Sequence, residues 1–73
     1  MMSYDEALRW LAAIGGTHGV VREDTREVVV VQVASASKGE VCARRTLDTT
    51  LSQEQAHRRA LALACDELRR ALS

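Results

Sequence analysis

The sequence predicts a single α+β domain with two layers, in which two helices cover one face of a small antiparallel sheet. A chain of 73 residues has room for one domain, which spans residues 1–73. Both ends of the chain repeat apolar residues at helical spacing, and the middle is rich in β-branched residues. Each predicted helix has one apolar stripe, so both helices must cover the same sheet face. The expected order is helix, two or three antiparallel strands, helix.

The first helix is predicted over Ser3–Ile14. Ser3 and Glu6 have the spacing of a capping box, and the first turn is acidic, as the helix dipole favours. Two glycines follow Ile14 and should end the helix. Trp10 lies beside the apolar face, where it is either a half-buried flanking residue or a contact for a partner. The apolar face consists of Tyr4, Ala7, Leu8, Leu11 and Ile14.

The central segment predicts strands over Arg26–Ser35 and Glu40–Asp48, joined by a small polar turn. The preceding His18–Glu23 is either a short strand or a loop. We favour a strand that enters the next one through Asp24 and Thr25, because it contains adjacent β-branched valines and a two-residue connection suits a hairpin.

The strand Arg26–Ser35 has an unusual second face. Alternation places Val29, Val31 and Val33 on one side, which we assign to the core beneath the helices. Val28 and Val30 then lie on the opposite, open face, beside Cys42 or Arg44 of the next strand. A strand with one wet face should alternate apolar and polar residues, so the sequence raises the question of what covers this second face.

The second helix is predicted over Ser52–Leu72. Ser52 and Gln55 again have the capping-box spacing, and Leu51 can pack against Ala56 across the cap. Small residues in the stripe should let the helix lie close to the sheet. The opposite face is charged, with Glu–Arg and Asp–Arg pairs four residues apart. The apolar stripe consists of Ala56, Ala60, Leu61, Ala64, Cys65, Leu68, Ala71 and Leu72.

The order of elements resembles the double-stranded-RNA-binding domain, whose plan is α-β-β-β-α. That family typically begins its last helix with Ser-Lys-Lys-x-Ala-Lys and an alanine-rich stretch. In "SQEQAHRRALALA", Ser52 and Ala56 match by spacing, whereas Gln53, Glu54 and His57 occupy the lysine positions. The family's proline-histidine loop is also missing. The resemblance implies this fold topology and RNA binding, but the chain lacks the lysines that hold phosphates in the family.

The residues that could carry chemistry do not form a recognisable motif. His18, Cys42, His57 and Cys65 are the only soft metal ligands, and none is paired at the spacing of a zinc knuckle. A Cys–His nucleophilic pair would lack a third group. The glycine-rich Gly15–Gly19 follows a helix and precedes a strand, the reverse of phosphate-binding loops. We therefore expect no enzyme and no cofactor, with Cys65 buried and Cys42 exposed.

Charge and composition narrow the partners and the location. Ten basic and ten acidic residues cancel, so no net charge steers the molecule toward nucleic acid or anionic lipid. Only two aromatic residues are present, too few for a base-stacking sheet. The N-terminus has no secretory signal, and no apolar run is long enough to span a membrane. We expect an intracellular, cytoplasmic protein with reduced cysteines.

Two classes of function remain open. One is a small non-enzymatic protein-interaction module that forms a homodimer or binds another protein, with Val28, Val30 and Trp10 as candidate contacts. Self-association would supply the extra stabilisation that so short a chain often needs. The other is a nucleic-acid-binding module on the same fold. Its candidate contacts are Arg44, Arg58, Arg59, Arg69 and Arg70. The alternative for the four arginines of the second helix is a solvated surface whose charges neutralise one another.

Overall fold

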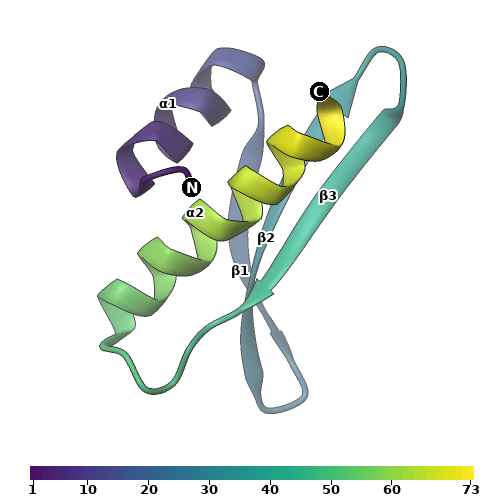
Figure 1. The fold of residues 1–73 in the computed structure, drawn as a ribbon. Helices are drawn as coiled ribbons and strands as arrows, with labels where there is room; N and C mark the ends of the chain where they lie inside the picture. The colour runs from purple at the N-terminus through teal and green to yellow at the C-terminus, as the bar shows by residue number, and fades with distance from the viewer.

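The computed structural model describes residues 1–73 and has the predicted two-layer α+β architecture (Figure 1). Its elements are α1 (Tyr4–Ile14), β1 (Thr17–Glu23), β2 (Arg26–Ser35), β3 (Gly39–Thr46) and α2 (Gln53–Leu72). The strands form one antiparallel sheet in the order β1-β2-β3. Both helices lie on the same side of it.

Both helices begin after the predicted N-cap residue, but only the first predicted capping box forms in full. The Ser3 hydroxyl accepts from the Glu6 backbone N–H at 3.1 Å, and the Glu6 carboxylate accepts in return from the Ser3 N–H. Gly15 ends α1 with a φ of 69°, in the left-handed region that favours glycine. At α2, the Ser52 hydroxyl accepts from the Gln55 N–H at 3.2 Å, but the Gln55 side chain returns no bond. The second capping box is therefore only half formed.

The segment before the valine strand is a strand and not a loop. It begins one residue earlier than predicted, at Thr17, and turns into β2 through Asp24 and Thr25. Asp24 has a φ of 57°, which aspartate tolerates better than most residues. The register is continuous from Thr17 opposite Gln32 to Glu23 opposite Arg26, so β1 contains no bulge.

Strand β3 ends at Thr46, two residues before the predicted end at Asp48. The Asp48 carboxylate accepts from both the backbone N–H and the hydroxyl of Thr50, at 2.9 and 2.6 Å. This local turn competes with the sheet for the backbone and redirects the chain toward α2.

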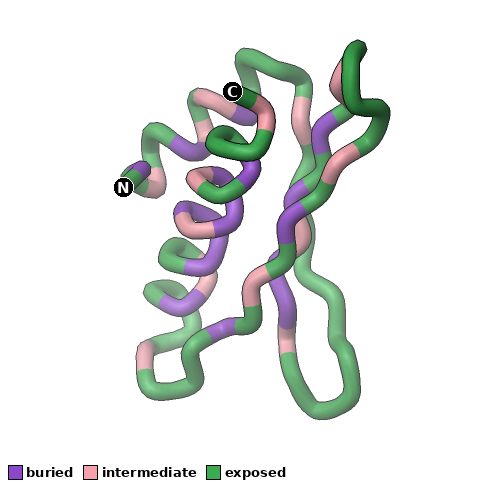
Figure 2. The backbone as a smooth tube through the Cα atoms, turned by 45° about the vertical axis from the view of Figure 1, so that its right-hand side comes forward, coloured by how far each residue is buried: buried purple, intermediate pink, exposed green.

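The core lies between α2 and the two strands β2 and β3 (Figure 2). Val29, Val31 and Val33 are buried in it, as the alternation predicts. Helix α1 packs against α2 and closes one side. Met2, which the sequence does not single out, is also buried. The core cluster consists of Met2, Ala7, Leu11, Val29, Val31, Val33, Ala43, Leu47, Ala56, Ala60, Leu61, Ala64, Cys65 and Leu68.

The turn between α1 and β1 depends on a close approach at Gly16. A Cβ at this position would lie 2.6 Å from Leu11 Cδ2 and 3.1 Å from Val33 Cγ2. Both neighbours are buried and cannot move without disturbing the core. We expect Gly16→Ala to lower the free energy of unfolding by about 1–3 kcal/mol in denaturant titrations. Gly19→Ala is the control, because nothing lies within 4 Å of its Cβ position. Equal stability of the two variants would contradict the steric argument.

Candidate functional site

The open face of β2 is more covered than its sequence predicts. Val28 and Val30 lie on the face away from the helices, opposite Thr46 and Arg44 of β3 respectively. Val30 is partly exposed, but Val28 retains only 4% of its accessible surface. Val28 therefore has little surface left to offer a partner.

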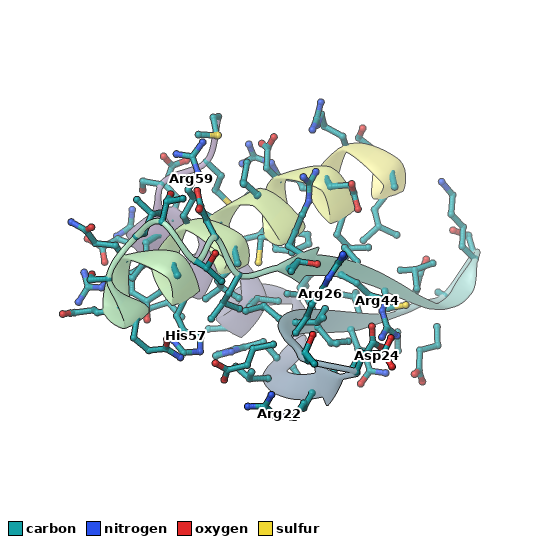
Figure 3. The ribbon with its side chains drawn as sticks, turned by 90° about the horizontal axis from the view of Figure 1, so that it is seen from below. Arg22, Asp24, Arg26, Arg44, His57 and Arg59 are labelled. Atoms are coloured by element: carbon teal, nitrogen blue, oxygen red, sulfur yellow. The ribbon has the colours of Figure 1, made fainter.

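An ion pair between the two edge strands covers Val28. Arg44 of β3 forms a salt bridge with Glu23 of β1 across the open face. Arg44 is aligned with Val30 and Glu23 with Arg26, and Val28 lies between these two β2 positions on the same face. In Figure 3 the helices lie above the sheet, and Arg44 points to the opposite side. The chain thus covers part of its own second face.

Strand β1, at one edge of the sheet, is the least buried of the three strands. All seven of its residues are exposed. Val20 is aligned with Val29 and faces the helix side, whereas Val21 is aligned with Val28 and faces the open side. These valines are 46% and 43% exposed, so an apolar side chain projects into solvent on each face of this strand.

Strand β1 has little of the protection that edge strands commonly carry, because its two charged residues, Arg22 and Glu23, lie together at its C-terminal end. It contains no proline, lysine or bulge, and neither helix packs over it. A shallow hollow of about 540 Å³ extends along it, lined by β1 residues together with Val30, Gln32 and Arg44. The sequence identifies Val20 and Val21 only as strand formers. The sequence pattern that could have indicated this edge is the pair of adjacent valines in the first strand of the sheet, which has polar residues on either side of them.

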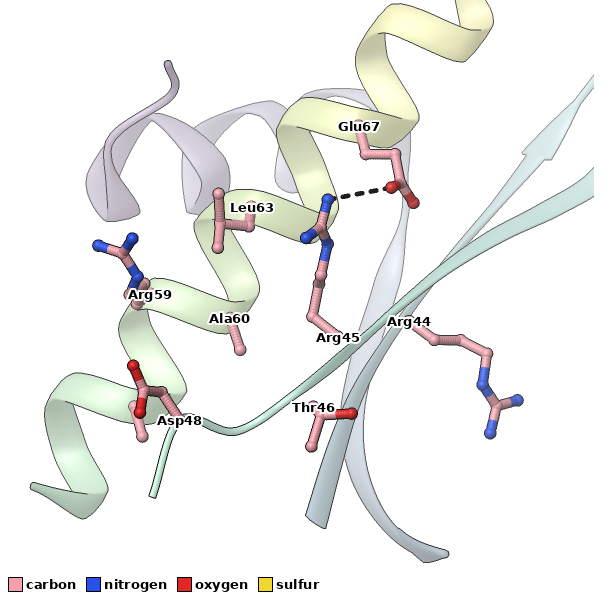
Figure 4. A pocket seen from close by; sticks show the side chains of 9 residues that line it. Arg44, Arg45, Thr46, Asp48, Arg59, Ala60, Leu63 and Glu67 are labelled. Atoms are coloured by element: carbon pink, nitrogen blue, oxygen red, sulfur yellow. Dashed lines mark hydrogen bonds and ion pairs between the residues drawn. The ribbon is translucent and has the colours of Figure 1, made fainter. Parts of the chain in front are cut away.

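The other sheet edge is protected by charge. Strand β3 carries Glu40, Arg44 and Arg45. Arg45 reaches toward α2 and donates to the Glu67 carboxylate at 3.1 Å, which joins this edge to the helix layer (Figure 4). Charged side chains on an edge strand disfavour pairing with another strand. The two edges therefore differ in what they can bind.

Trp10 lies apart from Val28 and Val30, on the helix side of the sheet. It is half-buried, packs against the core and lines a groove of about 360 Å³ with Ile14, Val33 and Leu72. The structure does not bring the three candidate self-association residues together on one surface.

The five candidate nucleic-acid contacts do not form one surface either. Arg44 lies on the open face, while the other four lie on α2. Four of the five form ion pairs within the chain: Arg44 with Glu23, Arg58 with Glu54, and Arg69 and Arg70 with Asp66.

Arg59 is the arginine of this set without an ion pair. It lines a groove of about 500 Å³ between α2 and β3, together with Asp48, Thr46 and Leu63 (Figure 4). Hydrogen bonds from the side chain and backbone of Thr50 lower the pKa of Asp48, and the charge of Arg59 contributes to the same shift. The groove thus holds both signs of charge, which weakens its attraction for a phosphate.

The cysteines and histidines are separated. Cys42 is exposed on the open face, whereas Cys65 is buried on the core-facing side of α2, as predicted. Neither thiol forms a disulfide. The His57 Nδ1 atom lies 3.0 Å from the backbone oxygen of Gln53, within α2. No group of three or more His, Cys, Asp or Glu side chains is arranged to hold a metal ion.

Comparisons with protein-family models, with curated proteins and with solved structures find no match. Neither helix is long and apolar enough to cross a membrane. Any proposal for function therefore depends on the geometry described above.

The two thiols should behave differently toward reagents. Burial raises the pKa of the Cys65 thiol to about 11. Because the thiolate is the reactive form, we expect a thiol reagent to modify Cys42 in the folded protein and both cysteines after denaturation. Rapid modification of both thiols under native conditions would contradict the burial of Cys65.

The same shift makes stability depend on pH. The folded protein keeps the Cys65 proton where the unfolded thiol, with its usual value of 9.0, ionises. The contribution of this thiol to the free energy of unfolding is therefore fully present below pH 9.0 and is lost as the pH rises toward about 11. Cys65→Ala should remove this component, so its free energy of unfolding should fall less steeply over that interval than that of the unmodified protein.

The ion pair over Val28 can be measured by a double-mutant cycle. Arg44→Gln, Glu23→Gln and the double variant should give a coupling energy of about 0.2–1 kcal/mol, because both side chains are half exposed. The coupling should decrease as salt is added. The pair Glu54–Arg58 within α2 is a matched reference. A cycle with no coupling would show that the salt bridge does not hold the two edge strands together.

Proposed function

We propose that this protein is a small, non-enzymatic interaction module that associates with a second copy of itself. The observation that carries the proposal is the edge strand β1, exposed along its whole length with a valine on each face. An unpaired strand edge presents backbone donors and acceptors that another strand can use, and exposed apolar side chains add a reason to pair.

Two properties of the whole chain support self-association. Its formal net charge is zero, so two copies do not repel each other over distance. Its buried core is small, and fourteen residues form the main cluster. Small cores are often supplemented by a partner subunit, because a short chain buries a limited share of its surface.

The distribution of charge favours a protein partner over nucleic acid. Affinity for nucleic acid comes mainly from cations that replace counterions on phosphates. Here four of the five candidate arginines are already paired with carboxylates. The exposed Glu54 occupies the start of α2, where the double-stranded-RNA-binding family carries lysine. These features support the interaction module, and RNA binding is the alternative that the experiment distinguishes.

The test combines light scattering with a gel shift. We expect the molar mass in solution to approach twice the 8.0 kDa of one chain as the concentration rises. We also expect no retardation of double-stranded RNA or DNA at low salt. A mass of 8.0 kDa at every concentration, with nucleic-acid binding that falls steeply as salt is added, would overturn the proposal in favour of the RNA-binding alternative.

A further inference from the structure

The geometry of β1 points to one particular dimer. We infer that two copies pair their β1 strands antiparallel about a twofold axis at Val20, which joins the two sheets into one continuous sheet. This inference depends on the proposed self-association and specifies its contact, its partner and its register.

The register follows from symmetry and strand length. A twofold axis perpendicular to the sheet pairs a residue that lies a given number of positions before the axis with the residue of the second copy that lies the same number of positions after it. With the axis at Val20, all seven residues of Thr17–Glu23 are paired. An axis one residue away, at Gly19 or Val21, pairs fewer of them. The register centred on Val20 therefore uses the whole exposed edge.

Shape complementarity on the open face supports the same register. Nothing lies within 4 Å of the position that a Cβ would take at Gly19, so the surface there is empty. Two residues along the same face, Val21 projects into solvent and is 43% exposed. In the centred register Val21 of each copy lies opposite Gly19 of the other. The projecting side chain and the empty position are thus matched twice across the axis.

The helix side of the contact fits as well. Val20 of each copy lies opposite its own counterpart, and this side chain is 46% exposed in one chain. Neighbouring apolar pairs across antiparallel strands stabilise a sheet. On this side His18 lies opposite Arg22, and on the open face Thr17 lies opposite Glu23. With histidine counted as neutral, no facing pair carries two charges of the same sign.

The open face of β2 continues the apolar contact. Val30 is aligned with Gly19 and is partly exposed. A valine from the second copy opposite Gly19 would lie on the same face as Val30, two strand spacings or about 10 Å away, with no side chain at Gly19 between them. This assigns Val30 a role at the margin of the contact, whereas Val28 stays covered by the Arg44–Glu23 pair. The occupant of the hollow along β1 is then Val21 of a second copy.

The first experiment measures the dimer dissociation constant of edge variants. Each copy contributes one Val21 to the contact, so Val21→Lys removes two valines. We expect the dissociation constant of the dimer to rise about tenfold for each of them. Ile14→Lys is the matched control, because Ile14 is similarly exposed but lies on α1, away from the edge. Thermal unfolding of both variants checks that they fold. A folded Val21→Lys variant that dimerises as well as the control overturns the β1 contact but leaves self-association intact.

The second experiment tests the register by disulfide cross-linking in a Cys42→Ser background. Val20→Cys should cross-link to itself under oxidation, since the axis passes through this position. Gly19→Cys mixed with Val21→Cys should form a mixed disulfide, and each alone should form far less. Cross-linking of Val21→Cys to itself, without the mixed product, would place the axis elsewhere and overturn the centred register. A chain that is monomeric throughout refutes the proposed function as well.

Discussion

The close packing of α2 on β2 and β3 is the contact on which the rest of the fold depends. Ala56, Ala60 and Ala64 form a ridge of small side chains, and all three are buried. Small residues let the helix backbone approach the sheet, where Val31 is fully buried. Because the cover of the sheet comes mainly from one helix, it reaches β2 and β3 and leaves β1 exposed on both faces.

Much of this arrangement can be predicted from the sequence, because local signals determine it. The capping residues Ser3 and Ser52 locate both helix starts, and the alternation of the valine strand selects the correct core face. The buried Cys65 follows from its place on the apolar stripe. Each of these features depends on residues close together in the chain, for which spacing alone is informative.

The features that decide the candidate site depend on contacts between distant residues. Glu23 and Arg44 meet only because three strands align in one register, and no spacing in the sequence shows that they cover Val28. The exposure of β1 depends on where α1 packs: it lies against α2 and does not cover β1. Amphipathic periodicity shows that a helix has an apolar face but does not show which surface that face will contact.

The difference between the two sheet edges bears on the size of any assembly. A sheet in which both edge strands can pair with another copy can add copies indefinitely and grow into a fibre. Here β3 carries Glu40, Arg44 and Arg45, and one of these arginines is tied to α2 through Glu67. In the dimer inferred above, the two β1 strands pair with each other. Only the two charged β3 strands then remain as exposed edges of the joined sheet. The fold would then limit itself to a closed, finite complex, which protects a small chain with an exposed strand from aggregation.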